Sequence, residues 1–312
     1  MKALAIHQYG GPEQLQIIET ALPIPGRGEV LVRVNAAGVN PVDYKIRNGS
    51  LKWLTGRKFP KILGGDIAGI VEKAGKTSPY KPGDKVFAML GISGGAYAEF
   101  VVVKEKQLCH IPESLSMTEA AATPLAALTA MQGLQKGDEI KTGDKILVNG
   151  ASGGVGTFAV QIAKAMGAHV TGVCSKKNIE FVKSLGADEV IDYSTEDFTV
   201  SKNRYNKVLD AVAKSSFTRC KRILTDEGTY ITTLPGPGIM FHKVFNFLRK
   251  KKAASVMVKP LGTDLAFLAG LIKKGLLKAH IEQTYPLAKG AAAHERIETE
   301  RVRGKLVLNI ID

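Results

Sequence analysis

The fold of this 312-residue chain is decided by a glycine-rich stretch that reads Asn149-Gly150-Ala151-Ser152-Gly153-Gly154-Val155-Gly156. The stretch follows an apolar run at 145–148 and opens a helical pattern at 157–166. A turn of this kind points backbone N–H groups and the positive end of a helix dipole at a phosphate. Ala151 replaces the first glycine of the G-x-G-x-x-G pattern, but the strand, turn and helix context is complete. We therefore predict that residues 151–156 bind a dinucleotide.

Strands and helices alternate along the chain around this turn. Strand-like apolar runs occur at 145–148, 169–173, 189–191, 207–212, 229–233 and 253–258. Glycine follows two of the intervening helical stretches, at Gly167 and Gly186, as expected of helix C-caps. This alternation predicts a doubly wound parallel sheet.

The N-terminal third of the chain has a different pattern. Short β-branched runs, separated by glycine and proline, occur at 30–34, 67–72, 85–89 and 98–103 and predict a mostly antiparallel β domain. An alanine-rich helical pattern at 119–134 leads into the parallel sheet, and a helix at 264–274 and a strand at 305–310 return to the first domain. We therefore expect an α/β plus β fold, in which a doubly wound domain (121–260) is inserted into a β domain (1–120 and 261–312).

Composition narrows the class of protein and its surroundings. With 45% hydrophobic residues, 23% charged residues and 33 glycines, the chain is neither disordered nor fibrous. Its three cysteines, Cys109, Cys174 and Cys220, are too widely spaced to suggest a disulfide framework or a zinc ribbon. The first residues lack the apolar core of a signal sequence. We expect a cytoplasmic protein, with import into an organelle left open.

The second strand of the predicted parallel sheet ends in Cys174-Ser175-Lys176-Lys177. An NAD site usually has an acidic residue here, about twenty residues after the turn, to bind the ribose 2′-hydroxyl. No acid occurs between Gly156 and Glu180, whereas two lysines and a hydroxyl group suit a 2′-phosphate. We therefore predict NADPH as the cofactor in preference to NADH. Tyr193 either stacks on the adenosine half or is an ordinary half-buried tyrosine.

The same turn also fits G-x-S-x-G, the nucleophile elbow of α/β-hydrolases, with Ser152 as the nucleophile. Asp264 and then His280 or His294 follow in the required order. The extra glycines, the lysine pair and the preceding β domain favour dinucleotide binding over this alternative.

Several stretches together resemble the medium-chain dehydrogenase/reductase superfamily. They are Asn40-Pro41-Val42-Asp43-Tyr44-Lys45, Gly64-Gly65-Asp66-Ile67-Ala68-Gly69, the glycine-rich turn and Val182-Lys183-Ser184-Leu185-Gly186-Ala187-Asp188. The chain is similar to the quinone oxidoreductase branch, which includes ζ-crystallin and the chloroplast alkenal/enone reductases. The resemblance covers nearly the whole chain. It implies a GroES-like catalytic domain, a Rossmann domain, a cofactor in the cleft between them and a homodimer formed through the last strand of the parallel sheet.

Zinc-dependent members of this superfamily carry a metal-binding cysteine in the first domain and a Gly-His-Glu motif. In this chain Gly65-Asp66 stands where His-Glu would be, and no cysteine precedes Cys109. The remaining residues do not supply the three protein ligands that a catalytic zinc needs in addition to its bound water. We therefore expect a metal-free, zinc-independent site.

A metal-free site with a nicotinamide cofactor predicts hydride transfer to an electron-poor acceptor, either a quinone or an α,β-unsaturated carbonyl (an enone or alkenal). The loop after the first long strand offers Asn40, Asp43 and Tyr44 as candidate catalytic residues. For Asn40 and Asp43, holding the loop is the alternative role. We expect Lys45 to contact the cofactor in preference to the substrate.

Further contacts are predicted with less direct support from the residues themselves. The resemblance implies that Thr129, on the helix between the domains, faces the cofactor. Gly236 follows the fifth strand of the parallel sheet, where it either passes close to the nicotinamide or simply serves the turn. Residues 51–59, with Trp53, would line or cover the substrate mouth, or belong to the core or rim.

The chain is strongly basic, with 43 Lys and Arg against 29 Asp and Glu and a formal net charge of +14. Six basic residues occur in a stretch without acids: Lys243, Arg249, Lys250, Lys251, Lys252 and Lys259. The alternative function is therefore a non-enzymatic NADPH-binding protein whose basic surface binds nucleic acid or an anionic membrane. A solvated helix face explains the same residues without any partner.

Overall fold

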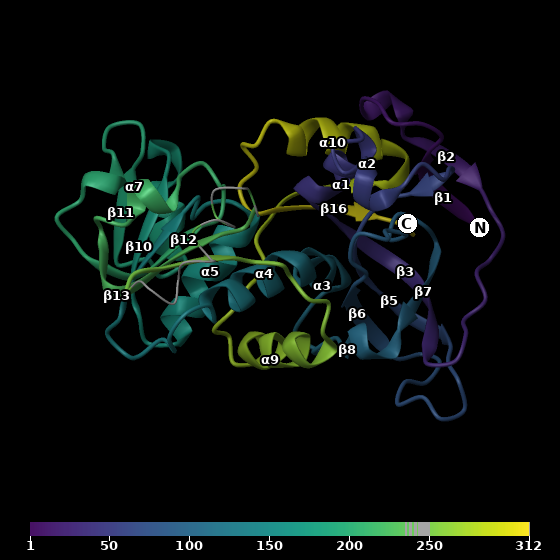
Figure 1. Ribbon diagram of the computed structural model, residues 1–312. Helices are drawn as coiled ribbons and strands as arrows, with labels where there is room; N and C mark the ends of the chain where they lie inside the picture. The colour runs from purple at the N-terminus through teal and green to yellow at the C-terminus, as the bar shows by residue number, and fades with distance from the viewer. Residues whose placement is uncertain (235, 237–238, 240–241, 243–249, 312) are drawn as a thin grey trace. The chain divides into compact units, whose positions relative to one another are not determined.

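The computed structural model describes residues 1–234, 236, 239, 242 and 250–311. The chain forms two compact units (Figure 1). We call Met1–Leu125 together with Lys259–Asp312 the β unit, and Ala126–Val258 the Rossmann unit. The Rossmann unit is thus inserted into the β unit, as the sequence predicts.

The β unit contains a seven-stranded sheet in the order β15-β16-β3-β5-β6-β8, with β7 also paired to β3. Its strands are β3 (Glu29–Val39), β5 (Asp66–Lys73), β6 (Lys85–Met89), β7 (Phe100–Lys104), β8 (Leu108–His110), β15 (Ile281–Pro286) and β16 (Lys305–Asn309). A smaller antiparallel sheet has the order β2-β1-β4, formed by β1 (Lys2–Ile6), β2 (Gln16–Glu19) and β4 (Lys61–Ile62). All pairs are antiparallel except β15 with β16, which confirms the mostly antiparallel domain.

The C-terminal strand β16 lies directly beside β3, as Figure 1 shows in yellow and purple. In this pairing Leu306 stands opposite Val39, so the end of the chain is joined to the strand that precedes the Asn40 loop. The helices of the β unit are α1 (Pro41–Arg47), α2 (Lys52–Thr55), α3 (Met117–Ala122), α9 (Gly262–Lys273) and α10 (Gly290–Glu298).

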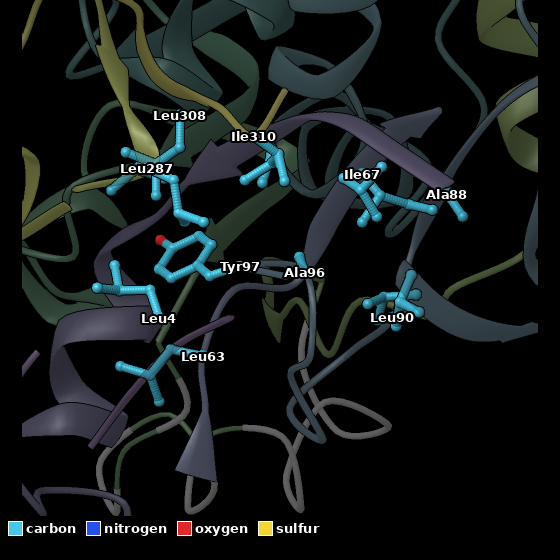
Figure 2. Close-up of a cluster of buried hydrophobic side chains, with 14 of the residues drawn as sticks. Leu4, Leu63, Ile67, Ala88, Leu90, Ala96, Tyr97, Leu287, Leu308 and Ile310 are labelled. Carbon is cyan, nitrogen blue, oxygen red and sulfur yellow. The ribbon is translucent and has the colours of Figure 1, made fainter. Parts of the chain in front are cut away.

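The core of the β unit gathers apolar side chains from distant parts of the sequence. Figure 2 shows Tyr97 among Leu4, Leu63 and Leu287, which are far apart in the sequence. All of these side chains are buried. Because Tyr97 carries a hydroxyl group, a polar partner is required inside this core.

The Rossmann unit has a six-stranded sheet in the order β11-β10-β9-β12-β13-β14, and every pair is parallel. This is the 3-2-1-4-5-6 order of doubly wound dinucleotide-binding sheets. Its strands are β9 (Lys145–Asn149), β10 (His169–Cys174), β11 (Glu189–Asp192), β12 (Tyr205–Asp210), β13 (Leu224–Thr232) and β14 (Lys252–Ser255). Its helices include α5 (Gly154–Ala165), α6 (Ile179–Ser184) and α7 (Phe217–Cys220), with α5 packed on β9 and β10.

Several predicted elements differ in their bounds from those observed, two of them for a clear structural reason. The single helix expected at 119–134 is two helices, α3 and α4 (Pro124–Leu134), because Pro124 has no N–H to continue α3. The strand expected at 98–103 begins only at Phe100, while Ala98 forms an isolated bridge to Ala3. Among the described helices, none has the length and apolar character needed to cross a bilayer.

Candidate active site

The glycine-rich turn joins the end of β9 to the start of α5. Gly150 has φ +83°, a left-handed conformation that favours glycine. A Cβ on Gly156 would lie 2.1 Å from the Gly150 carbonyl oxygen, so only glycine lets the helix start this close to the turn. Gly153 caps α5 without a side-chain hydrogen bond, which leaves the first backbone N–H groups of the helix for a ligand. The turn therefore fits the pyrophosphate of a dinucleotide.

The structure brings the end of β10 against this turn. Asn178 Nδ2 donates to Ser152 Oγ at 3.1 Å and to Ser175 Oγ at 3.3 Å, so one amide joins the two predicted cofactor loops. Cys174 is buried at the end of its strand, whereas the side chains of Lys176 and Lys177 are exposed. The sequence analysis missed Asn178, although its position just after the lysine pair was the available signal.

A second missed residue is Asp192, at the carboxyl end of β11. It stands opposite Cys174 in the parallel register, so a carboxylate faces the predicted 2′-phosphate site from the neighbouring strand. Hydrogen bonds from Ser194 and from the Lys176 backbone N–H, together with the Lys176 charge, lower the pKa of Asp192. The topology alone reveals this acid, because the residues between Gly156 and Glu180 contain none.

The remaining predicted cofactor residues lie at several places in the Rossmann unit. Thr129 is buried on α4, and Tyr193 is 62% exposed just after β11. Gly236 follows β13, and among the described atoms none lies within 4 Å of a Cβ added to it. The structure thus joins the turn and Ser175 through Asn178, which bonds to both.

The hydrolase alternative gains no support from the position of Ser152. Its hydroxyl accepts the Asn178 hydrogen bond within the Rossmann unit, whereas the proposed acid and histidines belong to the β unit. His294 is completely buried and lies 3.4 Å from the Tyr97 hydroxyl.

The predicted catalytic loop is part of a buried polar network in the β unit. The Asn40 backbone N–H donates to Asp43 Oδ2 at 2.8 Å, which caps the start of α1. Asn40 Nδ2 donates to Asp66 Oδ2 at 2.9 Å, and Lys305 Nζ donates to Asn40 Oδ1. The Leu125 backbone N–H donates to the other oxygen of Asp66 at 3.0 Å. Sequence reasoning missed Lys305, which lies 265 positions from Asn40.

Tyr97 joins this network to a histidine. Its hydroxyl donates to Asp43 Oδ2 at 3.0 Å and lies 3.4 Å from His294 Nε2. Burial raises the pKa of Asp43 to about 7 and that of Asp66 to about 6. Burial also lowers the pKa of His294 to about 3, with the Arg47 charge acting in the same direction. Lys305 Nζ lies 3.9 Å from Asp66 Oδ2, and burial lowers the pKa of this lysine.

These contacts define what the loop residues can do. Asn40 and Asp43 are each only 1% exposed, and their polar atoms are used inside the protein. Tyr44 is partly buried against the core, and Lys45 is also partly exposed on α1. The buried pair therefore holds α1 in position, whereas the side chains of Tyr44 and Lys45 are partly exposed.

The residues present do not fit a zinc ion. Within the described part of the chain, no group of three or more His, Cys, Asp and Glu side chains could hold a metal. Asp66, which stands in the position of the metal-binding His-Glu pair, accepts a hydrogen bond from Asn40 and lies 3.9 Å from Lys305 Nζ. No step of the chemistry is therefore assigned to a metal.

Comparisons with known proteins agree with this architecture. The family model for the alcohol dehydrogenase GroES-like domain matches residues 26–113, and the model for zinc-binding dehydrogenases matches residues 185–308. The chloroplast envelope quinone oxidoreductase homolog of Arabidopsis thaliana is 38% identical, covering 99% of this chain and 98% of its own.

Solved structures give the same result. The quinone oxidoreductase from Coxiella burnetii has a TM-score of 0.91 at 32% identity, covering 100% of this chain and 99% of its own. The Escherichia coli quinone oxidoreductase, solved in complex with NADPH, has a TM-score of 0.85 at 28% identity, covering 99% and 100% of the two chains.

A GroES-like β unit with an inserted Rossmann unit and a glycine-rich turn defines a two-domain oxidoreductase that uses a nicotinamide cofactor. The chain belongs to the quinone oxidoreductase branch of the medium-chain dehydrogenase/reductase superfamily.

Proposed function

We propose that the protein is an NADPH-dependent, zinc-independent reductase that transfers hydride to quinones or α,β-unsaturated carbonyls. The observation that carries this proposal is the contact of the glycine-rich turn with the Ser175 loop, which ends in two exposed lysines. The relatives named quinone oxidoreductases, one of them solved with NADPH, support the same reaction class.

The Rossmann unit would hold the cofactor through three groups of atoms. The free N–H groups at the start of α5 would bind the pyrophosphate. The hydroxyl of Ser175 and the ammonium groups of Lys176 and Lys177 would bind the 2′-phosphate. Asn178 would hold the two loops together through its hydrogen bonds to Ser152 and Ser175. Tyr193 would stack on the adenosine half, and Thr129 and Gly236 would contact the nicotinamide half. When bound, NADPH supplies the hydride.

The β unit would supply the groups that meet the acceptor. Reduction of a quinone or an enone develops negative charge on an oxygen atom, and hydrogen-bond donors placed in advance stabilise it. We assign this role to Tyr44 and assign Lys45 to the cofactor. Asn40 and Asp43 act as positioning residues, because their side chains are buried and hold the first turn of α1.

The non-enzymatic alternative has less support. Of the basic stretch, Lys243 and Arg249 lie outside the described residues. Lys251 Nζ donates to the carbonyl oxygens of Lys221 and Leu224, and Lys252 pairs with Asp138 at 3.2 Å. Two of the cations are therefore already engaged within the Rossmann unit.

Two further parts of the proposal concern assembly and location. Strand β14 is an edge of the parallel sheet, so a homodimer would form by pairing β14 with its copy, which light scattering would detect as twice the chain mass. The three free cysteines, two of them buried, fit a reducing compartment such as the cytoplasm.

The test is the rate of NADPH and NADH oxidation by chelator-treated protein, offered a simple quinone and a short-chain enone in parallel. We expect turnover with NADPH in the chelated enzyme and a preference for one acceptor. The double variant Ser175→Asp/Lys176→Glu should reverse the cofactor preference. Lys141→Glu is a charge-reversal control away from the cofactor loops, because it precedes β9 and so lies at the opposite end of that strand from the turn.

Two results would overturn the proposal. Loss of turnover on chelation, restored by zinc, would show a metal-dependent reaction. An unchanged NADPH to NADH ratio in the Ser175→Asp/Lys176→Glu variant would show that these residues do not bind the 2′-phosphate.

A further inference from the structure

Helix α2 presents two large apolar side chains to solvent. Trp53 is 77% exposed and Leu54 is 48% exposed. Trp53 is the only tryptophan in the chain. A large exposed aromatic side chain next to an exposed leucine is unusual on a protein surface and indicates an interaction site.

The exposure of Trp53 is a consequence of a well-formed local structure. The Leu51 carbonyl oxygen accepts hydrogen bonds from the backbone N–H groups of Leu54 and Thr55, which closes the short helix. Lys61 Nζ donates to the Thr55 carbonyl oxygen at 2.9 Å, and the Tyr9 hydroxyl donates to the Gly56 carbonyl oxygen. The segment is therefore tied down on both sides.

The apolar side chains of the same segment fall into a partly buried group and an exposed group. Phe59 packs on the core of the β unit, and its ring meets the ring of Tyr9 at 5.1 Å in an edge-to-face arrangement. Trp53 and Leu54 are not part of this core cluster and are exposed to solvent. One aromatic side chain of the segment thus completes the core, whereas the other adds nothing to it.

The charged residues near the exposed pair in the sequence are all positive. Lys52, Arg57 and Lys58 are all exposed. No acidic residue occurs between Asp43 and Asp66, so the sequence of the segment provides no internal counter-charge. We call Lys52, Trp53, Leu54, Arg57 and Lys58 the Trp53 surface.

We propose that the Trp53 surface docks the protein on an anionic lipid bilayer. Trp53 and Leu54 would enter the interfacial layer, where tryptophan is favoured because its ring is apolar and its N–H is polar. Lys52, Arg57 and Lys58 would meet the headgroups, and each cation near an anionic leaflet strengthens binding by about fivefold. The inference goes beyond the proposed function and does not depend on it.

The pattern favours a bilayer over a single-stranded nucleic acid. Binding of single strands uses several aromatic platforms along a basic groove, on which successive bases stack. The Trp53 surface has one exposed aromatic ring, and its apolar neighbour is an aliphatic side chain that has no flat face for stacking. An aliphatic and an indole side chain among cations are instead typical of membrane-interface segments.

The single tryptophan allows a direct test on the whole protein. Vesicles of phosphatidylcholine and phosphatidylglycerol (3:1) are added, and the emission maximum and acrylamide quenching of Trp53 are measured, with pure phosphatidylcholine vesicles alongside. We expect a shift to shorter wavelength and reduced quenching with the anionic vesicles only. Binding should weaken as salt is raised, because the headgroup attraction is screened.

Charge-reversal variants locate the interaction. Arg57→Glu/Lys58→Glu should lower the vesicle partition coefficient by at least about 25-fold, since each lost cation is worth about fivefold. Lys73→Glu/Lys76→Glu makes the same charge change at two other exposed positions of the β unit and should change partition by less than about threefold. Circular dichroism of both variants verifies that the fold is kept.

Several outcomes would overturn the proposal. Unchanged Trp53 emission with anionic vesicles shows that the surface does not enter a bilayer, and equal losses in the two double variants show a general charge effect. A blue shift with polyuridylate, with a quinone alone or with rising protein concentration assigns the surface to another occupant. Turnover of NADPH with a water-soluble quinone involves no lipid, so failure of the docking proposal and failure of the proposed function are measured separately.

Discussion

Replacing Asp43 with asparagine tests the buried network that positions the predicted catalytic loop. The change keeps an oxygen atom that can accept the hydrogen bonds from the Asn40 N–H and the Tyr97 hydroxyl, and it removes the ionisable group. The variant therefore isolates the effect of the buried carboxyl group on stability.

The sign and size of the effect follow from the burial of Asp43. Its pKa rises from 3.8 in a free side chain to about 7 in the folded protein. Between these values the folded protein holds a proton that the unfolded chain has released, so the free energy of unfolding falls as the pH rises through this window. The loss is at most about 4 kcal/mol, since each tenfold change in an equilibrium constant is about 1.4 kcal/mol. Relative to wild type, Asp43→Asn should gain up to that amount between about pH 4 and about pH 7.

The assay is guanidinium unfolding, followed by circular dichroism, of both proteins across this pH range. Asp66 titrates in the same direction as Asp43, and His294, with its lowered pKa, titrates in the opposite direction. His294 is present in both proteins, whereas the charge of Asp66 raises the pKa of Asp43, so the difference between the two profiles includes this coupling. Asp226→Asn, at an exposed position, is the control and should follow wild type at every pH. Parallel pH profiles of wild type and Asp43→Asn would refute the reasoning.

Three further predictions concern the turn, the network and the loop contact. Gly156→Ala should weaken dinucleotide binding at least about tenfold, because the new Cβ would lie 2.1 Å from the Gly150 carbonyl oxygen; wild-type affinity by calorimetry would contradict this. Lys305→Met should lower the free energy of unfolding by about 3–5 kcal/mol at neutral pH, because Asp66 loses its buried cation, and denaturant titration measures the loss. Asn178→Ala should raise KM for NADPH severalfold and leave kcat near wild type, since it removes the link between the two cofactor loops; an unchanged KM in steady-state kinetics would argue against the link.

Local sequence patterns were sufficient for the architecture. Alternating strands and helices with glycine C-caps indicated the parallel sheet, and short β-branched runs indicated the antiparallel one, because each pattern reports burial along a single element. The helix at 119–134 was the exception, since its alanine-rich spacing continued through Pro124, which starts a new helix.

The candidate site was predicted only in part. The turn and the Ser175 loop could be proposed as cofactor contacts, because doubly wound sheets commonly bind a dinucleotide after their first two strands. Asn178 and Asp192 lay outside this pattern. Asp192 lies opposite Cys174 because β11 pairs with β10. This strand order is a property of the folded sheet.

By itself, the sequence determined the two-domain plan and the position of the glycine-rich turn between a strand and a helix, because both depend on residues that are close together in the chain. Only the tertiary structure decided that Asn40 and Asp43 are buried supports and that Lys305 and Tyr97 are their partners. The physical reason is that a buried polar atom must find a partner wherever the fold provides one, and here the last strand and the core tyrosine provide it. Such pairings join residues separated by most of the chain, so no local pattern contains them.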